Sequence, residues 1–301
     1  MNQSEPGFLL KRLTAKFFWD SYDFLGRLVL MNLILFLLGG IIFFVLYVLG
    51  SPFYQSFESH PVRQSFIGIS FWILSSFIFG GFSFSGIIYF ASKITKESEP
   101  VFKDFFKGIK LFGLKSALLG FILAVIIIVL ILNVIFYSSG KFLPPSMKFI
   151  GMCLAGICFW GILFVFSLLM FSFPVLVTQN VSLKKNFLRS LLLTLDNPFL
   201  VLYAIGIFVI LFFISWITKG VGLFIFFISF TGVLMNSLLD NALLKYKIRE
   251  EREAKNATVP QEKKETFTSW KQIKQTQEEK EEKEIDRYKR SLRDILKPWE
   301  Y

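Results

Sequence analysis

The chain has few of the residues on which metal sites and redox chemistry usually depend. Its 301 residues include one histidine and two cysteines, Cys153 and Cys158. Both thiols lie in an apolar run, and a spacing of five residues puts them on different faces of a helix, so they are not expected to pair with each other. No spacing typical of structural zinc or of a redox Cys-x-x-Cys motif is present. The sequence therefore predicts no metal and no cofactor.

Charged residues are also scarce in the first 239 residues. The last 62 residues hold 16 of the 33 Lys and Arg and 14 of the 22 Asp and Glu. Apolar residues make up 54% of the chain without counting its 20 glycines, whereas soluble domains have roughly 45–50% with glycine included. This composition excludes a soluble globular enzyme, a disordered protein and a disulfide-rich secreted module.

Six runs are long and apolar enough to cross a bilayer, because about 20 helical residues span ~30 Å of hydrocarbon. The last two are separated by only three residues and predict a tight hairpin, with a re-entrant pair as the alternative. Residues 1–27 show no cleavable signal peptide. The predicted fold is an all-α polytopic membrane protein with an N-terminal segment (1–27), a six-helix domain (28–239) and a charged tail (240–301). The six runs are residues 28–48, 66–91, 116–137, 149–177, 198–216 and 220–239.

Lysine and arginine are unevenly distributed between the segments that join these runs. Thirteen lie before the first, third and fifth runs, and four lie in the loops on the opposite side. Because short cytoplasmic loops carry the excess of Lys and Arg, both termini are predicted to be cytoplasmic.

The three segments that precede the odd-numbered runs are amphipathic. One opens the chain within residues 1–27, one extends from Phe102 to Phe112, and one from Leu183 to Leu195. Such helices lie in the headgroup plane, with the apolar face in the bilayer and the lysines on anionic lipid headgroups. The first 239 residues would then consist of three repeated units, each an interfacial helix followed by a hairpin of two apolar runs. The alternative is that the three amphipathic segments are unrelated linkers.

Ionisable residues are absent from the centre of every run, although such residues usually mark ion paths and substrate sites in membranes. The asparagines of the runs are Asn32, Asn133 and Asn236, and serines cluster in the second run. An asparagine could line a substrate path, or it could form an interhelical hydrogen bond.

Small residues four positions apart allow helix backbones to approach closely. Such pairs occur in the second and fourth runs, which are therefore predicted to be central in the bundle. The pairs are Ser76 and Gly80, Gly81 and Ser85, and Gly151 and Ala155.

No catalytic motif is found for a serine hydrolase, a zinc protease or a P-loop nucleotidase. Asp20 and Asp23 lie three residues apart on the predicted cytoplasmic side, but nothing beside them in the sequence completes a site. A polar helix face explains these carboxylates equally well.

The tail is predicted to be helical over 240–255 and again from Gln277, with a polar break between them. The second helix has a narrow apolar stripe that could cover the protein's own cytoplasmic face, a second copy or another protein. A solvated helix without a partner is the alternative, and the nearly balanced charge does not predict binding to nucleic acid. The stripe consists of Ile285, Tyr288, Leu292, Ile295 and Leu296, followed by Trp299.

Several short motifs resemble the YesL-like family of bacterial multi-spanning membrane proteins, a domain of unknown function. The likeness covers residues 15–245, and the long charged tail departs from it. The resemblance implies a non-enzymatic protein of the bacterial inner membrane. The motifs lie at Phe84–Lys93, Val101–Gly108, Phe173–Pro174, Ser182–Phe187 and Asp196–Pro198.

Three functions are compatible with these features. The first is a non-enzymatic accessory, scaffold or assembly factor that binds a membrane or cytoplasmic partner, or a second copy, through its interfacial helices and tail. The second is a transporter or permease subunit, which needs a polar cavity lined by the three asparagines and the serines. The third is a lipid-modifying enzyme, which needs Asp20, Asp23 and Asp104 in one cluster.

Overall fold

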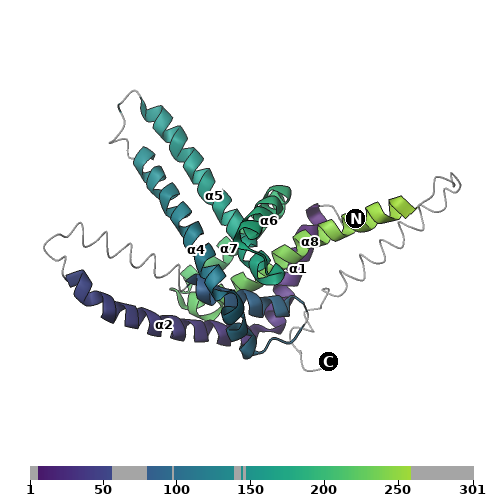
Figure 1. Ribbon diagram of the computed structural model, residues 1–301, viewed down its shortest axis with the longest axis horizontal. Helices are drawn as coiled ribbons and strands as arrows, with labels where there is room; N and C mark the ends of the chain where they lie inside the picture. Colours follow the sequence, from purple (N-terminus) through teal and green to yellow (C-terminus); the bar gives the residue numbers. More distant parts are fainter. Residues whose placement is uncertain (1–5, 56–79, 97, 139–143, 145–146, 259–301) are drawn as a thin grey trace.

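The computed structural model describes residues 6–55, 80–96, 98–138, 144 and 147–258, and every regular element among them is helical. This confirms the all-α class. Residues 80–94 form a helical segment without a label in Figure 1. The labelled elements are α1 (Pro6–Asp23), α2 (Leu25–Gln55), α4 (Phe102–Ser138), α5 (Lys148–Gln179), α6 (Leu183–Asp196), α7 (Pro198–Ile217), the π-helix η2 (Leu223–Phe227) and α8 (Ile228–Thr258).

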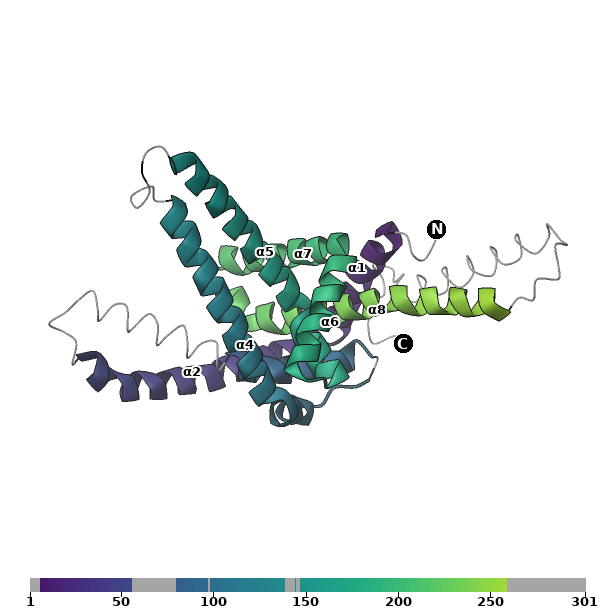
Figure 2. The same ribbon diagram turned by 45° about the horizontal axis from the view of Figure 1, so that its top comes forward.

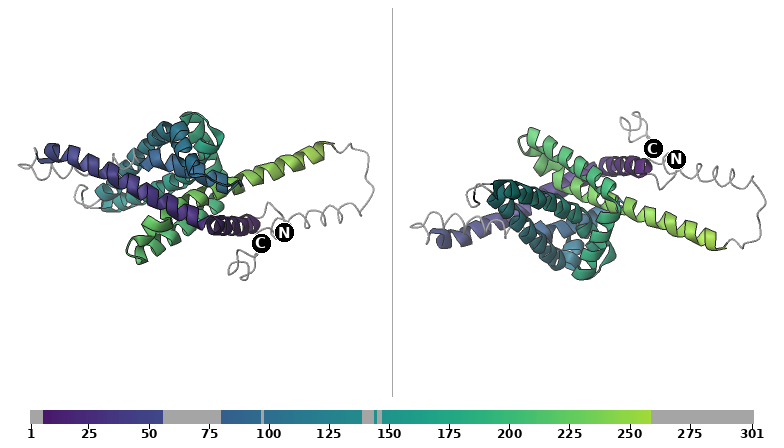
Figure 3. Two further views of the ribbon diagram at one scale, coloured as in Figure 1. Left: turned by 90° about the horizontal axis from the view of Figure 1, so that it is seen from below. Right: turned by 90° about the horizontal axis from the view of Figure 1, so that it is seen from above.

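The helices diverge from a common centre (Figure 1). The antiparallel pair α4 and α5 extends away in one direction, and α2 extends in another. In the view of Figure 2, α7 and the start of α8 lie behind the α4–α5 pair. The end of α8 projects beyond the other labelled helices in both views of Figure 3.

Buried side chains gather in one region, which we call the junction. Fully buried aromatic residues there come from α1 (Phe8), the segment 80–94 (Phe90), α4 (Phe105) and α5 (Phe171). The junction comprises α1, residues 80–94, and the parts of α2, α4, α5 and α8 packed with them: 28–35, 102–124, 167–177 and 228–246.

The remaining lengths of three helices, which we call the arms, are apolar and largely uncovered. They are residues 36–48 of α2, 125–138 of α4 and 148–166 of α5. Among their described side chains only Gly151 is buried. Apolar helices that are uncovered by protein are expected where lipid is the solvent, because acyl chains cover such surfaces without penalty.

Four described helical stretches are long and apolar enough to cross a membrane: α4, α5, α7 and Leu223–Lys247. The bent pair Gly7–Asp23 and Leu25–Ile41, with an angle of 78° at Phe24, would make a fifth if it is one span. The chain is therefore an all-α membrane protein. Most of the predicted second run, including Ser76, lies outside the described residues.

The amphipathic segment at Phe102–Phe112 differs from the prediction. Instead of a separate helix in the headgroup plane, it is the first part of α4, which continues unbroken for 37 residues. At 1.5 Å per residue α4 is about 55 Å long, more than the ~30 Å of the hydrocarbon region. No proline interrupts it, and Gly113 packs tightly against the ring of Phe82. The first and third amphipathic segments do form helices of their own, α1 and α6.

Candidate functional site

The polar side chains of the junction bond to one another across helices that are distant in the sequence. Lys16 of α1 is 6% exposed, and its Nζ donates to the Thr95 carbonyl oxygen and to Oδ2 of Asp240, each at 2.9 Å. One turn earlier on α1, Arg12 donates to Oδ1 of Asn241 at 3.3 Å. These bonds tie the start of the chain to the point where α8 becomes highly charged. A buried ammonium needs such a partner, because desolvation of an unpaired charge is strongly unfavourable.

A second polar contact joins the corner between α6 and α7 to α8. The Lys245 ammonium donates to Oδ2 and to the main-chain oxygen of Asp196, both at 3.0 Å, and to Oδ1 of Asn197 at 3.3 Å. The Tyr246 hydroxyl donates to the same Asp196 carboxylate at 2.6 Å. Asn197 is the last residue before α7, and Pro198 occupies the first turn, where the missing N–H is not needed.

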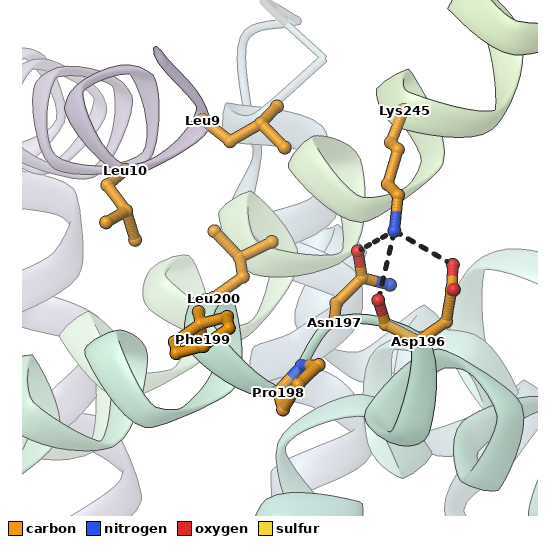
Figure 4. A pocket seen from close by; sticks show the side chains of 8 residues that line it. All are labelled: Leu9, Leu10, Asp196, Asn197, Pro198, Phe199, Leu200 and Lys245. Carbon is orange, nitrogen blue, oxygen red and sulfur yellow. Dashed lines mark hydrogen bonds and ion pairs between the residues drawn. The ribbon is translucent and has the colours of Figure 1, made fainter. Parts of the chain in front are cut away.

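A small pocket of about 160 Å³ opens at this corner (Figure 4). Ligand sites are usually 300–1,000 Å³, so it is too small for most organic substrates. The Lys245 ammonium already has three acceptors, which leaves it little capacity for an anion. The pocket therefore belongs to the contact between helices. Its lining residues are Leu9, Leu10, Asp196, Asn197, Pro198, Phe199, Leu200 and Lys245.

The fully buried Asn32 of α2 holds the π-helix. Its Nδ2 donates to the carbonyl oxygens of Leu223 and Phe224 at 2.8 and 3.0 Å. Its Oδ1 accepts from the backbone N–H and the hydroxyl of Ser229, both at 3.0 Å. A π-helix shifts the hydrogen-bond ladder by one residue, and this amide satisfies groups at both ends of the shift.

The other two asparagines lie elsewhere. Asn236 is buried and donates to the carbonyl oxygens of Ile88 and Gly232. It is two helical turns from Ser229, or about 10 Å along α8. Asn133 lies on the arm of α4 and donates to Val129 of its own helix. The three amides therefore make separate contacts with helix backbones and do not line a common polar path.

The three carboxylates considered for an enzyme do not form a cluster either. Oδ2 of Asp104 accepts from the Val101 N–H at 3.1 Å, which caps the start of α4. Asp20 and Asp23 lie on α1, the first half-buried and the second exposed. Among the described residues no group of three or more His, Cys, Asp or Glu could hold a metal ion.

The small residues predicted for helix packing have different surroundings. A Cβ at Gly81 would lie 2.7 Å from the Ser116 carbonyl oxygen, so the helical segment 80–94 touches α4 there. Ser85 is fully buried, whereas Gly80 is exposed with nothing within 4 Å of an added Cβ. On α5, Gly151 is buried and Ala155 is half-buried.

Sequence reasoning missed several residues of this region. Gly86 and Gly108 approach each other across the contact between the segment 80–94 and α4, where a Cβ on Gly108 would lie 3.0 Å from the Gly86 Cα. The pairing of Lys16 with Asp240 was also missed. The available signal was that both residues border apolar segments whose ends were predicted to face the same compartment.

The apolar stripe of the tail, from Ile285 to Trp299, lies outside the described residues. No family model matches the chain, and comparison with curated proteins and with solved structures found no match. The resemblance to the YesL-like family therefore stays a prediction.

Proposed function

We propose that the protein is a non-enzymatic accessory or scaffold protein of the bacterial inner membrane. In this proposal the arms lie in lipid, the ion pairs of the junction lie near the cytoplasmic surface with both termini on that side, and the tail engages a membrane or cytoplasmic protein. The chain then serves to hold a partner at the membrane rather than to convert a substrate.

The observation that carries the proposal is the use of polar groups in the junction. Lys16, Lys245 and Asn32 each bond to main-chain or side-chain groups of another helix. Catalytic and transport sites instead direct polar groups toward a space that a substrate can enter. Polar groups that bond helices to one another stabilise a single arrangement of those helices, as a scaffold protein requires.

The projection of α8 supports the same proposal. This helix continues to Thr258, beyond the most buried part of the junction, with a sequence rich in Arg, Lys and Glu. In this proposal the charged end of α8 joins the body of the protein to the partner-binding tail.

Cross-linking in intact membranes tests the role of the tail. The variant Leu292→Ser/Ile295→Ser interrupts the apolar stripe and should abolish recovery of the protein that cross-links to the wild-type tail. The matched control, Arg290→Ser/Asp294→Ser, changes two residues of the opposite helical face without altering net charge, and should keep that recovery. Equal recovery with both variants, and with Gln277–Tyr301 deleted, would refute the tail as the contact.

The transporter alternative is not favoured by any described contact, since its proposed lining residues are dispersed. It predicts solute flux in proteoliposomes that disappears with Asn32→Leu and Asn236→Leu together, whereas the scaffold proposal predicts no flux in either protein.

A further inference from the structure

The helix α6 exposes several of its large apolar residues and buries uncharged polar ones. Four residues face the body of the protein: Asn186, Ser190, Leu193 and Thr194. Three of these are polar. Four large apolar residues face away from the protein with 42–61% of their surface exposed: Phe187, Leu188, Leu192 and Leu195. An amphipathic helix on a water-soluble protein has the opposite arrangement.

The buried side of α6 is not arranged to satisfy its polar groups. The Thr194 hydroxyl donates to the Ser190 carbonyl oxygen of the same helix. Within the described residues, neither polar atom of the Asn186 amide nor the Ser190 hydroxyl has a hydrogen-bond partner. Burial of such groups is unfavourable, so the contact with the body does not by itself explain this orientation. A favourable environment around the exposed apolar side of α6 explains this orientation.

The bilayer is the environment that fits this side. Directly after α6, the chain turns at Asn197 into α7, which is long and apolar enough to span a membrane. Phe199 and Leu202 of α7 are 72% and 58% exposed. The apolar surface of α6 therefore adjoins lipid-facing residues of a candidate span in the chain.

The charges of α6 indicate the kind of lipid. Lys184, Lys185 and Arg189 are exposed, and Arg189 donates only to the neutral amide oxygen of Gln179 among its described contacts. The one acidic residue of the helix, Asp196, is already paired with Lys245. Three basic side chains thus remain available beside the apolar surface. Each such charge near an anionic membrane surface favours binding.

We propose that α6 is an anionic-phospholipid site. Phe187, Leu188, Leu192 and Leu195 lie among the upper acyl chains, while Lys184, Lys185 and Arg189 bind the headgroup phosphates. The exposed side of α6 binds anionic phospholipid in preference to zwitterionic phospholipid, next to the start of α7. The inference rests on the membrane location in the proposed function, but not on the scaffold role or on the tail.

Fluorescence quenching by brominated lipids tests the proposal on the full chain. In a background with Cys153→Ser and Cys158→Ser, a bimane label is attached at Leu192→Cys. The protein is reconstituted into vesicles of phosphatidylcholine with increasing fractions of either brominated phosphatidylglycerol or brominated phosphatidylcholine. The two titrations give the relative binding constant of the anionic lipid at α6. A label at Ile210→Cys, on an exposed apolar position of α7 remote from the basic residues, is the matched control.

The label at position 192 should be quenched by both lipids, with phosphatidylglycerol favoured by about five-fold or more. At position 210 the two lipids should quench equally. The substitutions Lys185→Gln and Arg189→Gln should reduce the preference at position 192 to near unity while quenching persists, because the apolar contact remains.

Absence of quenching at position 192 would overturn the proposal, and cross-linking between two copies at that position would identify a second chain as the occupant. Equal binding of both lipids by the unsubstituted helix would also overturn it. Neither result would affect recovery of a tail partner, so failure of this inference is distinguishable from failure of the scaffold proposal.

Discussion

The two apolar helices α8 and α4 differ in how much of their spanning part the protein buries. In Leu223–Lys247, which comprises η2 and most of α8, 56% of the most apolar part is buried, compared with 22% in α4. The α8 stretch is less hydrophobic, with a mean hydropathy of 1.8 against 3.3. The more hydrophobic helix is therefore the less buried one, which is the reverse of the rule for soluble proteins.

Polar residues explain this difference. The buried part of α8 contains Ser229, Thr231, Asn236, Ser237 and Asn241, whereas the arm of α4 contains only Asn133 and Ser138 among uncharged hydrogen-bonding residues other than tyrosine. Lipid is as apolar as leucine, so apolar residues gain little by leaving it. Three of the polar residues of α8, Ser229, Asn236 and Asn241, do gain hydrogen bonds with other helices. The contrast between the junction and the arms follows from where such residues occur.

The largest loss of stability is expected from breaking the Lys16–Asp240 ion pair of the junction, whose side chains are 8% and 27% exposed. Lys16→Met leaves the Asp240 carboxylate without its ammonium partner, and should lower the free energy of unfolding by about 3 kcal/mol. Lys245→Met is the matched control, because that pair is 33% and 51% exposed and should contribute under about 1 kcal/mol. Unfolding in mixed micelles with increasing SDS measures both. Equal losses would remove the distinction between the two ion pairs.

A smaller loss is expected from removing the amide that holds the π-helix. Asn32→Leu removes the partner of two carbonyl groups and of the Ser229 N–H, and should destabilise the protein by about 2 kcal/mol. Asn133→Leu, on the arm of α4, removes only a bond within one helix and should change stability by under about 0.5 kcal/mol. The same SDS titration compares the pair. A larger effect at position 133 would contradict the assignment of the arm to lipid.

Glycine substitutions are expected to give the smallest difference in stability between the junction and the arms. Gly81→Ala should cost about 1.5 kcal/mol, because the new Cβ meets the α4 backbone. Gly156→Ala on the arm of α5 has nothing within 4 Å and should leave stability unchanged or raise it by about 0.5 kcal/mol. Thermal unfolding of the two variants in detergent distinguishes them. Destabilisation of both would mean that the arm is packed against another chain.

Local sequence patterns predicted the helical class and the apolar helices well. Hydrophobic length alone located α5 and α7 to within two residues, and Pro198 marked the start of α7. The continuity of α4 was missed because its amphipathic start was interpreted as a separate helix, although no residue type there requires a break. Helix boundaries depend on nearby residue types such as proline, and these can be read from the sequence.

The arrangement of the helices was harder to predict. Small-residue spacing correctly drew attention to Gly81. It gave no indication that Leu223–Lys247 is the most buried of the four candidate spans. The partners of Asn32 and Lys16 lie about 200 residues away in the sequence. No local pattern specifies such pairings, since they depend on which helices meet.

The account depends most on the placement of the junction's two ion pairs, Lys16–Asp240 and Lys245–Asp196, at one membrane surface, which we call the junction side, with the turn between α7 and η2 at the other. Single cysteines introduced into the Cys153→Ser/Cys158→Ser background at Lys11, Lys107, Lys185 and Lys247 report the junction side. A cysteine at Lys219, in the turn between α7 and η2, reports the far side. A membrane-impermeant thiol reagent is applied to intact cells and to inverted membrane vesicles.

The first four positions should react only in inverted vesicles, and position 219 only in intact cells. Labelling of positions 11 and 247 from opposite sides would contradict the account, because Lys16 and Asp240 could then not form their ion pair at one surface.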